Sequence, residues 1–256
     1  MEGAGEVIAG DGFAPGAAVG CGTRLGGFAE IVSVASPAVR PKPAHLSFAE
    51  AASVGTAYLT AYVALVRLGM AQAGEWALVH GATGGVGLAA IDLAKALGCR
   101  VIAASRSAEK LAVVARDYAP DATVTTPGFR EAVKEITGGG ADLIYDPVGG
   151  DVFDESTRCI AFGGRLLVVG FTSGRIATVS TNMPLIKGFS VIGVRAGEYG
   201  RRFPDKGREN LDAIWRLAAE GRIRPRVHAE YPLADWRAAF EAMRDSGMVG
   251  KLVLVP

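Results

Sequence analysis

The feature that most constrains the fold of this sequence is a series of short, mostly apolar stretches that begins near residue 76. Trp76–His80, Arg100–Ala104 and Asp142–Asp146 are each too short to be a core helix, and helical patterns separate them. Strands that are apolar on both faces are typical of a parallel sheet covered by helices on both sides. Because such crossovers are right-handed, the pattern predicts a doubly wound α/β domain.

The remaining predicted elements extend this series. The predicted helices cover residues 56–68, 88–97, 108–118, 129–137 and 152–161, and further strands cover residues 122–125, 165–170 and 189–194. This alternation predicts one domain over residues 53–198.

The pattern is different on either side of that domain. Before it, residues 5–9 and 26–34 are predicted strands, and Ser47 with Glu50 forms a capping box at a helical turn. After Gly197, the predicted helices are 209–220 and 233–244, and the predicted strands are 227–231 and 251–255. We therefore expect residues 1–52 and 199–256 to share a second, β-rich lobe.

A glycine cluster follows the strand that ends at His80. It contains Gly81, Gly84, Gly85 and Gly87 and directly precedes a helix. A phosphate needs free backbone N–H groups at a helix N-terminus, and glycine lets the backbone approach it closely. The spacing is not a strict G-x-G-x-x-G, and a P-loop is excluded because no Gly-Lys-Ser/Thr follows. The strand–turn–helix context favours a dinucleotide-binding turn over a glycine-rich helix start that serves packing alone.

The next predicted strand, residues 100–104, ends at the position where a dinucleotide-binding fold contacts a ribose of the cofactor. An Asp or Glu at this position would bind the 2′-hydroxyl of NAD, but this chain has Ser105, Arg106 and Ser107, with Lys110 one turn later. Hydroxyl, guanidinium and ammonium groups suit a 2′-phosphate, so NADP is the expected cofactor. The alternative is a solvated helix start with Ser107 as its N-cap.

Two later strands end in turns that contain glycine, Asp146-Pro147-Val148-Gly149-Gly150 and Val169-Gly170-Phe171-Thr172. Ligands of open α/β sheets bind beyond the carboxyl ends of the strands. These turns are therefore candidates to face a flat ring, although ordinary turn chemistry explains them equally well.

Composition excludes several classes of protein. The net charge is +1 and the basic residues are spread along the chain, so neither nucleic-acid nor membrane-surface binding is indicated. No stretch is long enough to be a transmembrane helix, and Met1-Glu2-Gly3 does not open a signal peptide, so we predict a cytoplasmic protein. Three cysteines and three histidines at wide spacing predict neither disulfides nor a metal site.

Several segments together resemble one family. GTAYLTAYVAL, HGATGGVGLAA, DLIYDPVGGDVFDESTRCIAFGGRLLVVGF, SVIGV and the terminal GKLVLVP look like the zinc-independent NADPH:quinone oxidoreductase-like group of the medium-chain dehydrogenase/reductase superfamily. The resemblance covers nearly the whole chain. It implies a Rossmann domain and a GroES-like β-barrel lobe with the cofactor between them, and a homodimer formed through the strand at residues 190–194.

The resemblance also implies positions for the cofactor. Thr56 and Thr60 would lie near the nicotinamide, and Tyr62 is a candidate proton donor, although an aromatic residue on an apolar helix usually belongs to the core. The other implied contacts are Gly84, Gly85, Val86 and Gly87 for the pyrophosphate, Ser105, Arg106 and Lys110 for the 2′-phosphate, and Val148, Val169, Gly170 and Phe171 for the ring.

The sequence also departs from the family pattern. Zinc-dependent relatives have a Gly-His-Glu motif where this chain has Met1 and Glu2, so we expect no metal. Gly16-Ala17-Ala18-Val19 replaces the usual Gly-Asp-Arg-Val turn, and the chain begins within the GroES-like lobe. We expect a partial barrel with unpaired strand edges, which are a liability for stability and aggregation.

The predicted reaction is hydride transfer from NADPH to a quinone or an α,β-unsaturated carbonyl. Two alternatives stay open. One is an enoyl-CoA or enoyl-thioester reductase, for which Arg201, Arg202 and Arg208 could bind the CoA phosphates. The other is a non-catalytic NADP-binding protein.

Overall fold

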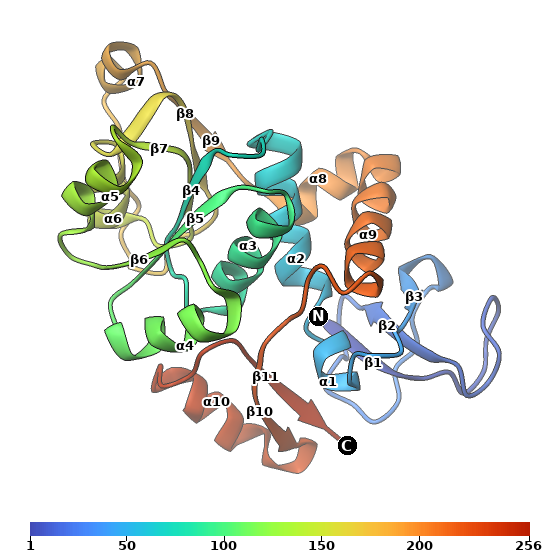
Figure 1. The fold of residues 1–256 in the computed structure, drawn as a ribbon. Coiled ribbons are helices and arrows are strands. Elements are labelled where there is room, and N and C mark those ends of the chain that lie inside the picture. Colours follow the sequence, from blue (N-terminus) through green and yellow to red (C-terminus); the bar gives the residue numbers. More distant parts are fainter.

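The computed structural model describes residues 1–256, and its centre is a six-stranded parallel sheet (Figure 1). The strand order is β6-β5-β4-β7-β8-β9, so the order reverses between β4 and β7. The bounds are β4 (Trp76–Val79), β5 (Arg100–Ser105), β6 (Ala122–Thr125), β7 (Ala141–Asp146), β8 (Ile160–Val168) and β9 (Ser190–Gly193). The predicted doubly wound α/β fold is confirmed. Folds of this kind bind ligands beyond the carboxyl ends of the strands between which the order reverses, which are β4 and β7 here.

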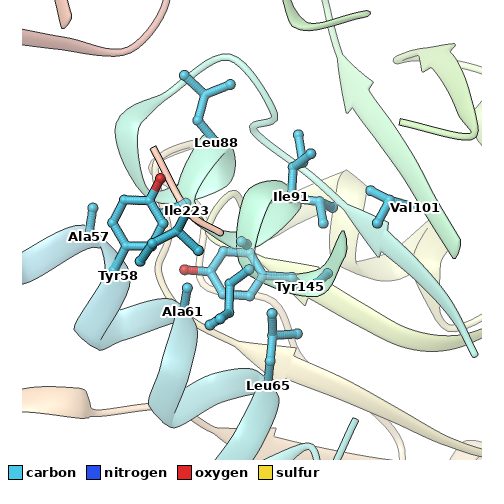
Figure 2. Packing of buried hydrophobic residues seen from close by; sticks show 14 of the residues in the cluster. Ala57, Tyr58, Ala61, Leu65, Leu88, Ile91, Val101, Tyr145 and Ile223 are labelled. Carbon is cyan, nitrogen blue, oxygen red and sulfur yellow. The ribbon is translucent and has the colours of Figure 1, made fainter. Parts of the chain in front are cut away.

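Helices cover both faces of this sheet. On one face lie α2 (Gly55–Tyr62), which continues as a π-helical stretch over Val63–Leu68, α3 (Gly85–Ala96) and α4 (Ala108–Tyr118). Figure 2 shows Tyr58 and Leu65 of the α2 segment packed with Ile91 of α3 and Tyr145 of β7. On the opposite face lie α5 (Phe129–Thr137) and α6 (Gly150–Ser156), over a smaller apolar cluster.

Two small sheets lie outside the parallel sheet. The first is antiparallel and contains β1 (Glu2–Glu6), β2 (Ala18–Gly22) and β3 (Val39–Pro41), while β10 (Val227–Pro232) and β11 (Lys251–Val255) form a parallel pair. The remaining helices are α1 (Phe48–Ala51), α7 (Asn182–Lys187), α8 (Ala196–Arg202), α9 (Pro204–Ala219) and α10 (Trp236–Arg244). Figure 1 shows the first strands (blue) and the last elements (red) on the same side of the parallel sheet.

The N-terminal strands contact the C-terminal part of the chain directly. The ring of Trp215 on α9 lies where a Cβ on Gly20 would stand, at 2.1 Å, so α9 packs directly on β2. Ser47 accepts from Glu50 N, and the Glu50 carboxylate accepts from Ser47 N at 2.8 Å, which confirms the predicted capping box of α1. None of the helices has both the length and the apolar character that crossing a membrane requires.

The predicted strand over residues 26–34 is wrong. This segment forms no strand, and Phe28 and Ile31 are 58% and 70% exposed. An alternating pattern forms a strand only where a neighbouring strand accepts its backbone hydrogen bonds, and none lies there. The strand predicted over residues 5–9 forms earlier, as β1.

The predicted helix over residues 152–161 is too long, because α6 ends at Ser156. Ala141 N donates to the carbonyl of Cys159, and Ile160 is the first residue of β8. Residues 160 and 161, the last two of the predicted helix, therefore belong to β8 instead. Neither α7 nor α8 was predicted.

Candidate cofactor site

The glycine turn leads directly into α3, which begins at Gly85 rather than at the predicted Leu88. The first hydrogen bond of the helix runs from Leu88 N to Gly84 O at 2.9 Å. The amides of Gly85, Val86 and Gly87 therefore precede the hydrogen-bonded ladder and are the donors that a helix N-terminus offers to an anion. Gly84 is exposed at the N-cap position, so this end of the helix is open to solvent.

Gly87 has no room for a side chain, and Gly85 is covered by the flexible side chain of Lys251. A Cβ on Gly87 would lie 2.2 Å from the carbonyl oxygen of Gly81, which itself accepts from Gly84 N at 3.0 Å. A Cβ on Gly85 would lie 2.9 Å from Cδ of Lys251. The turn is therefore a close-packed cradle lined by backbone amides, which fits a pyrophosphate group.

Lys251 lies at this turn, and sequence reasoning did not find it. It is the first residue of β11, and the preceding Gly250 pairs with Gly84 and donates to Thr83 O at 3.0 Å. The Lys251 ammonium is 2.6 Å from the carboxylate of Glu2. The Gly-Lys pair ahead of the last strand was visible in the sequence, but only tertiary packing brings it to Gly85.

Glu2 connects the glycine turn with α2. Its second carboxylate oxygen accepts from Thr56 N at 2.6 Å, at the N-terminus of α2. Thr56 therefore lies near the turn, and Thr60 hydrogen-bonds back to the Thr56 carbonyl at 2.9 Å. Tyr62 is six residues beyond Thr56, about 9 Å further along the helix axis, and the guanidinium of Arg67 lies 6.0 Å from its ring centre. This position does not favour Tyr62 as the proton donor.

The predicted 2′-phosphate residues lie at the carboxyl end of β5. Ser105 ends the strand and is buried, Arg106 is exposed, and the Ser107 hydroxyl caps α4 by accepting from Lys110 N at 3.2 Å. The Lys110 ammonium donates to the carbonyl of Ser246, so it is already engaged with the C-terminal segment. Of these residues, Arg106 is the most accessible cation.

The turns after β7 and β8, residues 146–150 and 169–172, pack against each other beside the glycine turn. We call them the ring-side turns, because they contain the predicted contacts of the cofactor ring. Thr172 N donates to Pro147 O at 3.1 Å, and Ser173 N donates to Val148 O at 3.0 Å. A Cβ on Gly149 would lie 2.9 Å from the ring of Phe171. The structure thus brings the predicted ring contacts together in one group, formed by Val148, Val169, Gly170 and Phe171.

His80 lies at the start of the glycine turn but is fully buried. Its Nε2 is 2.9 Å from the Ser156 hydroxyl, which itself donates to Val152 O, so His80 donates this hydrogen bond. Burial lowers the pKa of His80 to about 3, so it is neutral at physiological pH. His80 is therefore a structural residue.

A sizeable cavity lies away from this site. A cavity of about 880 Å³ lies at the other end of α3, where Lys95, Asp92 and the segment from Arg222 to Arg226 surround it. Its charged side chains are mostly paired with one another, as in Arg224 with Glu50 and Arg226 with Asp117. No group of three or more His, Cys, Asp or Glu side chains in the structure is arranged to hold a metal ion.

Comparison with known proteins assigns the family. A family profile described as zinc-binding dehydrogenase matches residues 85–216, from the first residue of α3 to the last turn of α9. This chain belongs to that family. Within the medium-chain dehydrogenase/reductase superfamily it belongs to the quinone oxidoreductase-like group.

The most informative relatives cover nearly all of this chain. A quinone oxidoreductase-like protein 2 homologue from Nematostella vectensis is 36% identical over 91% of this chain and 65% of the relative. A probable oxidoreductase from Mycobacterium abscessus superposes with a TM-score of 0.89 at 38% identity, over 100% of this chain and 79% of the other. The quinone oxidoreductase of Thermus thermophilus, solved alone and with NADPH, has a TM-score of 0.84 at 33% identity. The match covers 96% of this chain and 79% of the Thermus chain. The chain spans less than two thirds of the length of the first curated relatives that it matches.

Proposed function

We propose that this protein is an NADP(H)-dependent oxidoreductase that reduces a quinone or an α,β-unsaturated carbonyl. The observation that supports this most strongly is the amide-lined turn at the N-terminus of α3, in which Gly87 has no room for a side chain. The family, and the NADPH complex of the Thermus relative, support the same cofactor. When bound, the cofactor supplies a hydride, which carries both electrons of the reduction.

The proposed cofactor contacts lie at four strand ends of the parallel sheet, those of β4, β5, β7 and β8. The amides of Gly85, Val86 and Gly87 would hold the pyrophosphate, with the Lys251 ammonium beside them. Arg106 would bind the 2′-phosphate, since no carboxylate stands at the end of β5 to accept a 2′-hydroxyl. The turns after β7 and β8 would orient the ring and exclude water from it.

Reduction of a quinone by NADPH also consumes a proton, and no side chain of the site has to supply it. A quinone that has accepted a hydride can take a proton from solvent, so a dedicated acid is not required. Thr56 and Thr60 are the two threonines of α2, and we assign them to orientation of the ring rather than to proton transfer. On this assignment the reaction does not require a metal ion.

The acceptor is tested by following NADPH oxidation with 9,10-phenanthrenequinone and, separately, with crotonyl-CoA, beside an NADPH binding titration. Turnover of the quinone supports the proposal, and turnover of crotonyl-CoA alone would favour the enoyl-thioester reductase. Binding without turnover of either would favour a non-catalytic protein. Arg201 and Arg202 pair with Glu198, and Arg208 pairs with Asp205, so a CoA phosphate would have to compete with these exposed carboxylates for the three arginines.

We also propose that the protein forms a homodimer through β9, the edge strand of the parallel sheet. Val191 is 37% exposed on this strand, and Leu185 and Ile186 of the neighbouring α7 are 82% and 73% exposed. An unpaired edge beside exposed apolar side chains is a typical site for strand pairing. Light scattering after gel filtration would test this, with Leu185→Asp expected to yield monomer. The cytoplasmic location stays a prediction.

A further inference from the structure

Asp146, the last residue of β7, is hydrogen-bonded to both ring-side turns. Its carboxylate Oδ1 accepts from Val148 N at 2.8 Å and from Gly149 N at 2.9 Å. Its backbone carbonyl accepts from Val169 N at 2.8 Å and from Gly170 N at 3.3 Å. One residue thus orders the turn that follows its own strand and the turn that follows the neighbouring strand β8.

These turns are packed so tightly that a displacement of one reaches the others. A Cβ on Gly170 would lie 3.2 Å from Pro147 O, and a Cβ on Gly81 would lie 3.1 Å from Cγ of Pro147. The segment that Asp146 anchors is therefore in contact with both the Gly170 turn and the glycine turn. Because close-packed atoms transmit displacement, the Asp146 carboxylate sets the shape of this edge of the site.

The position of Asp146 is costly for a carboxylate. The residue is completely buried, and its Oδ2 has no hydrogen-bond partner. Burial raises the pKa of Asp146, while the two backbone N–H donors act in the opposite direction. A buried polar atom without a partner destabilises a fold, so a residue of this kind calls for an explanation beyond stability.

We propose that Asp146 is a positioning residue that holds the Val148–Gly149 and Val169–Gly170 turns in the shape that receives the nicotinamide half of the cofactor. It acts through these backbone segments. The inference rests on the proposed function, because it assumes that NADP(H) binds along the carboxyl ends of the strands.

The test compares two ligands that differ in the part of the site they occupy. NADPH would reach both the Arg106 end and the ring-side turns, whereas 2′,5′-ADP carries the 2′-phosphate but lacks the nicotinamide half. In Asp146→Ala, the backbone N–H groups of Val148 and Gly149 lose their acceptor, so we expect the NADPH affinity to fall at least about tenfold. We expect the affinity for 2′,5′-ADP to stay within about twofold, because Arg106 lies at a different strand end.

Asp142 provides a matched control on the same strand. Its carboxylate accepts from Trp76 N at 2.8 Å, near the opposite end of β7. Asp142→Ala also deprives a backbone N–H of a carboxylate acceptor, so it should lower the unfolding temperature and leave both affinities unchanged. Asp146→Asn keeps an oxygen acceptor and should restore most of the NADPH affinity.

The outcomes separate the inference from the proposed function. If the wild-type protein binds neither ligand, the proposed function fails. If the wild-type protein binds both and Asp146→Ala weakens both equally or neither, the positioning role is overturned. Should Asp146→Ala not fold, Asp146→Glu serves instead: it keeps the charge but displaces the oxygens, and NADPH affinity equal to that of the wild type would contradict the inference.

Discussion

Two regions of this chain are rich in glycine for different reasons. In the turn from Gly81 to Gly87 the backbone is packed so closely that a Cβ on Gly87 would overlap the Gly81 carbonyl. In the N-terminal strands and their connecting turns, a Cβ on Gly5 or on Gly22 would have nothing within 4 Å. Glycine content alone therefore does not mark a binding site. What marks it is a glycine without room for a side chain, next to unbonded amides at a helix N-terminus.

The sharpest test of this comparison is Gly87→Ala, for which we expect the largest effect. A methyl group must displace the Gly81 carbonyl, so the turn should open, NADPH binding should be lost, and stability should fall by about 1–3 kcal/mol. Titration calorimetry and thermal unfolding measure the two effects. In the matched control Gly5→Ala, with open space at the Cβ, stability should change by no more than about 0.5 kcal/mol. Equal effects in the two variants would remove the distinction between the two regions.

The second prediction concerns recognition of the 2′-phosphate by Arg106 at the end of β5. Arg106→Glu replaces the most accessible cation at the end of β5 with a repelling charge, so NADPH affinity should fall about 100-fold. NADH lacks the 2′-phosphate, and its affinity should change by less than about threefold. Arg100→Glu, at the first position of the same strand, is the matched control and should leave both affinities unchanged. Equal losses for NADPH and NADH in Arg106→Glu would contradict the assignment.

Much of the doubly wound domain could be predicted because its signals are local. Ser107 caps α4, and the bounds of α4, α5 and β6 agree with the amphipathic and apolar patterns. The segment over residues 26–34 has a similar strand pattern but no partner strand, and a pattern carries no information on its partner. Contacts between distant parts of the chain, such as Lys251 with Glu2 at the glycine turn, were unpredictable for the same reason.

The three histidines differ in burial, since His80 is buried beside the glycine turn while His45 and His228 are exposed in the second lobe. The pKa of His80 is lowered from 6.5 to about 3 by burial. Between these values the unfolded chain binds more protons than the folded protein, so stability is lost as pH falls from 6.5 toward 3. Between about pH 6.5 and about pH 4, protonation linked to His80 should lower the free energy of unfolding by about 3 kcal/mol.

Urea unfolding across this pH range measures that contribution. His80→Gln can still donate to Ser156 but does not titrate, so its stability should fall by correspondingly less than that of the wild type. Parallel pH profiles for the two proteins would show that His80 is not held neutral by the core.

The smallest expected effect concerns Lys251, which the second lobe contributes to the glycine turn. Lys251→Met keeps the methylene stem over Gly85 but removes the ammonium, so affinity for both NADPH and NADH should fall about tenfold, because both carry a pyrophosphate. Glu2→Gln breaks the same ion pair but leaves the ammonium in place, and it should not weaken either ligand. A loss confined to NADPH in Lys251→Met would instead place this lysine at the 2′-phosphate.

The most direct test of the account is titration of the wild-type protein with NADPH and with NADH in the same buffer. A cradle of free amides at α3 together with Arg106 at the end of β5 predicts that both bind and that NADPH binds at least about tenfold more tightly. No binding of either dinucleotide, or tighter binding of NADH, would contradict it.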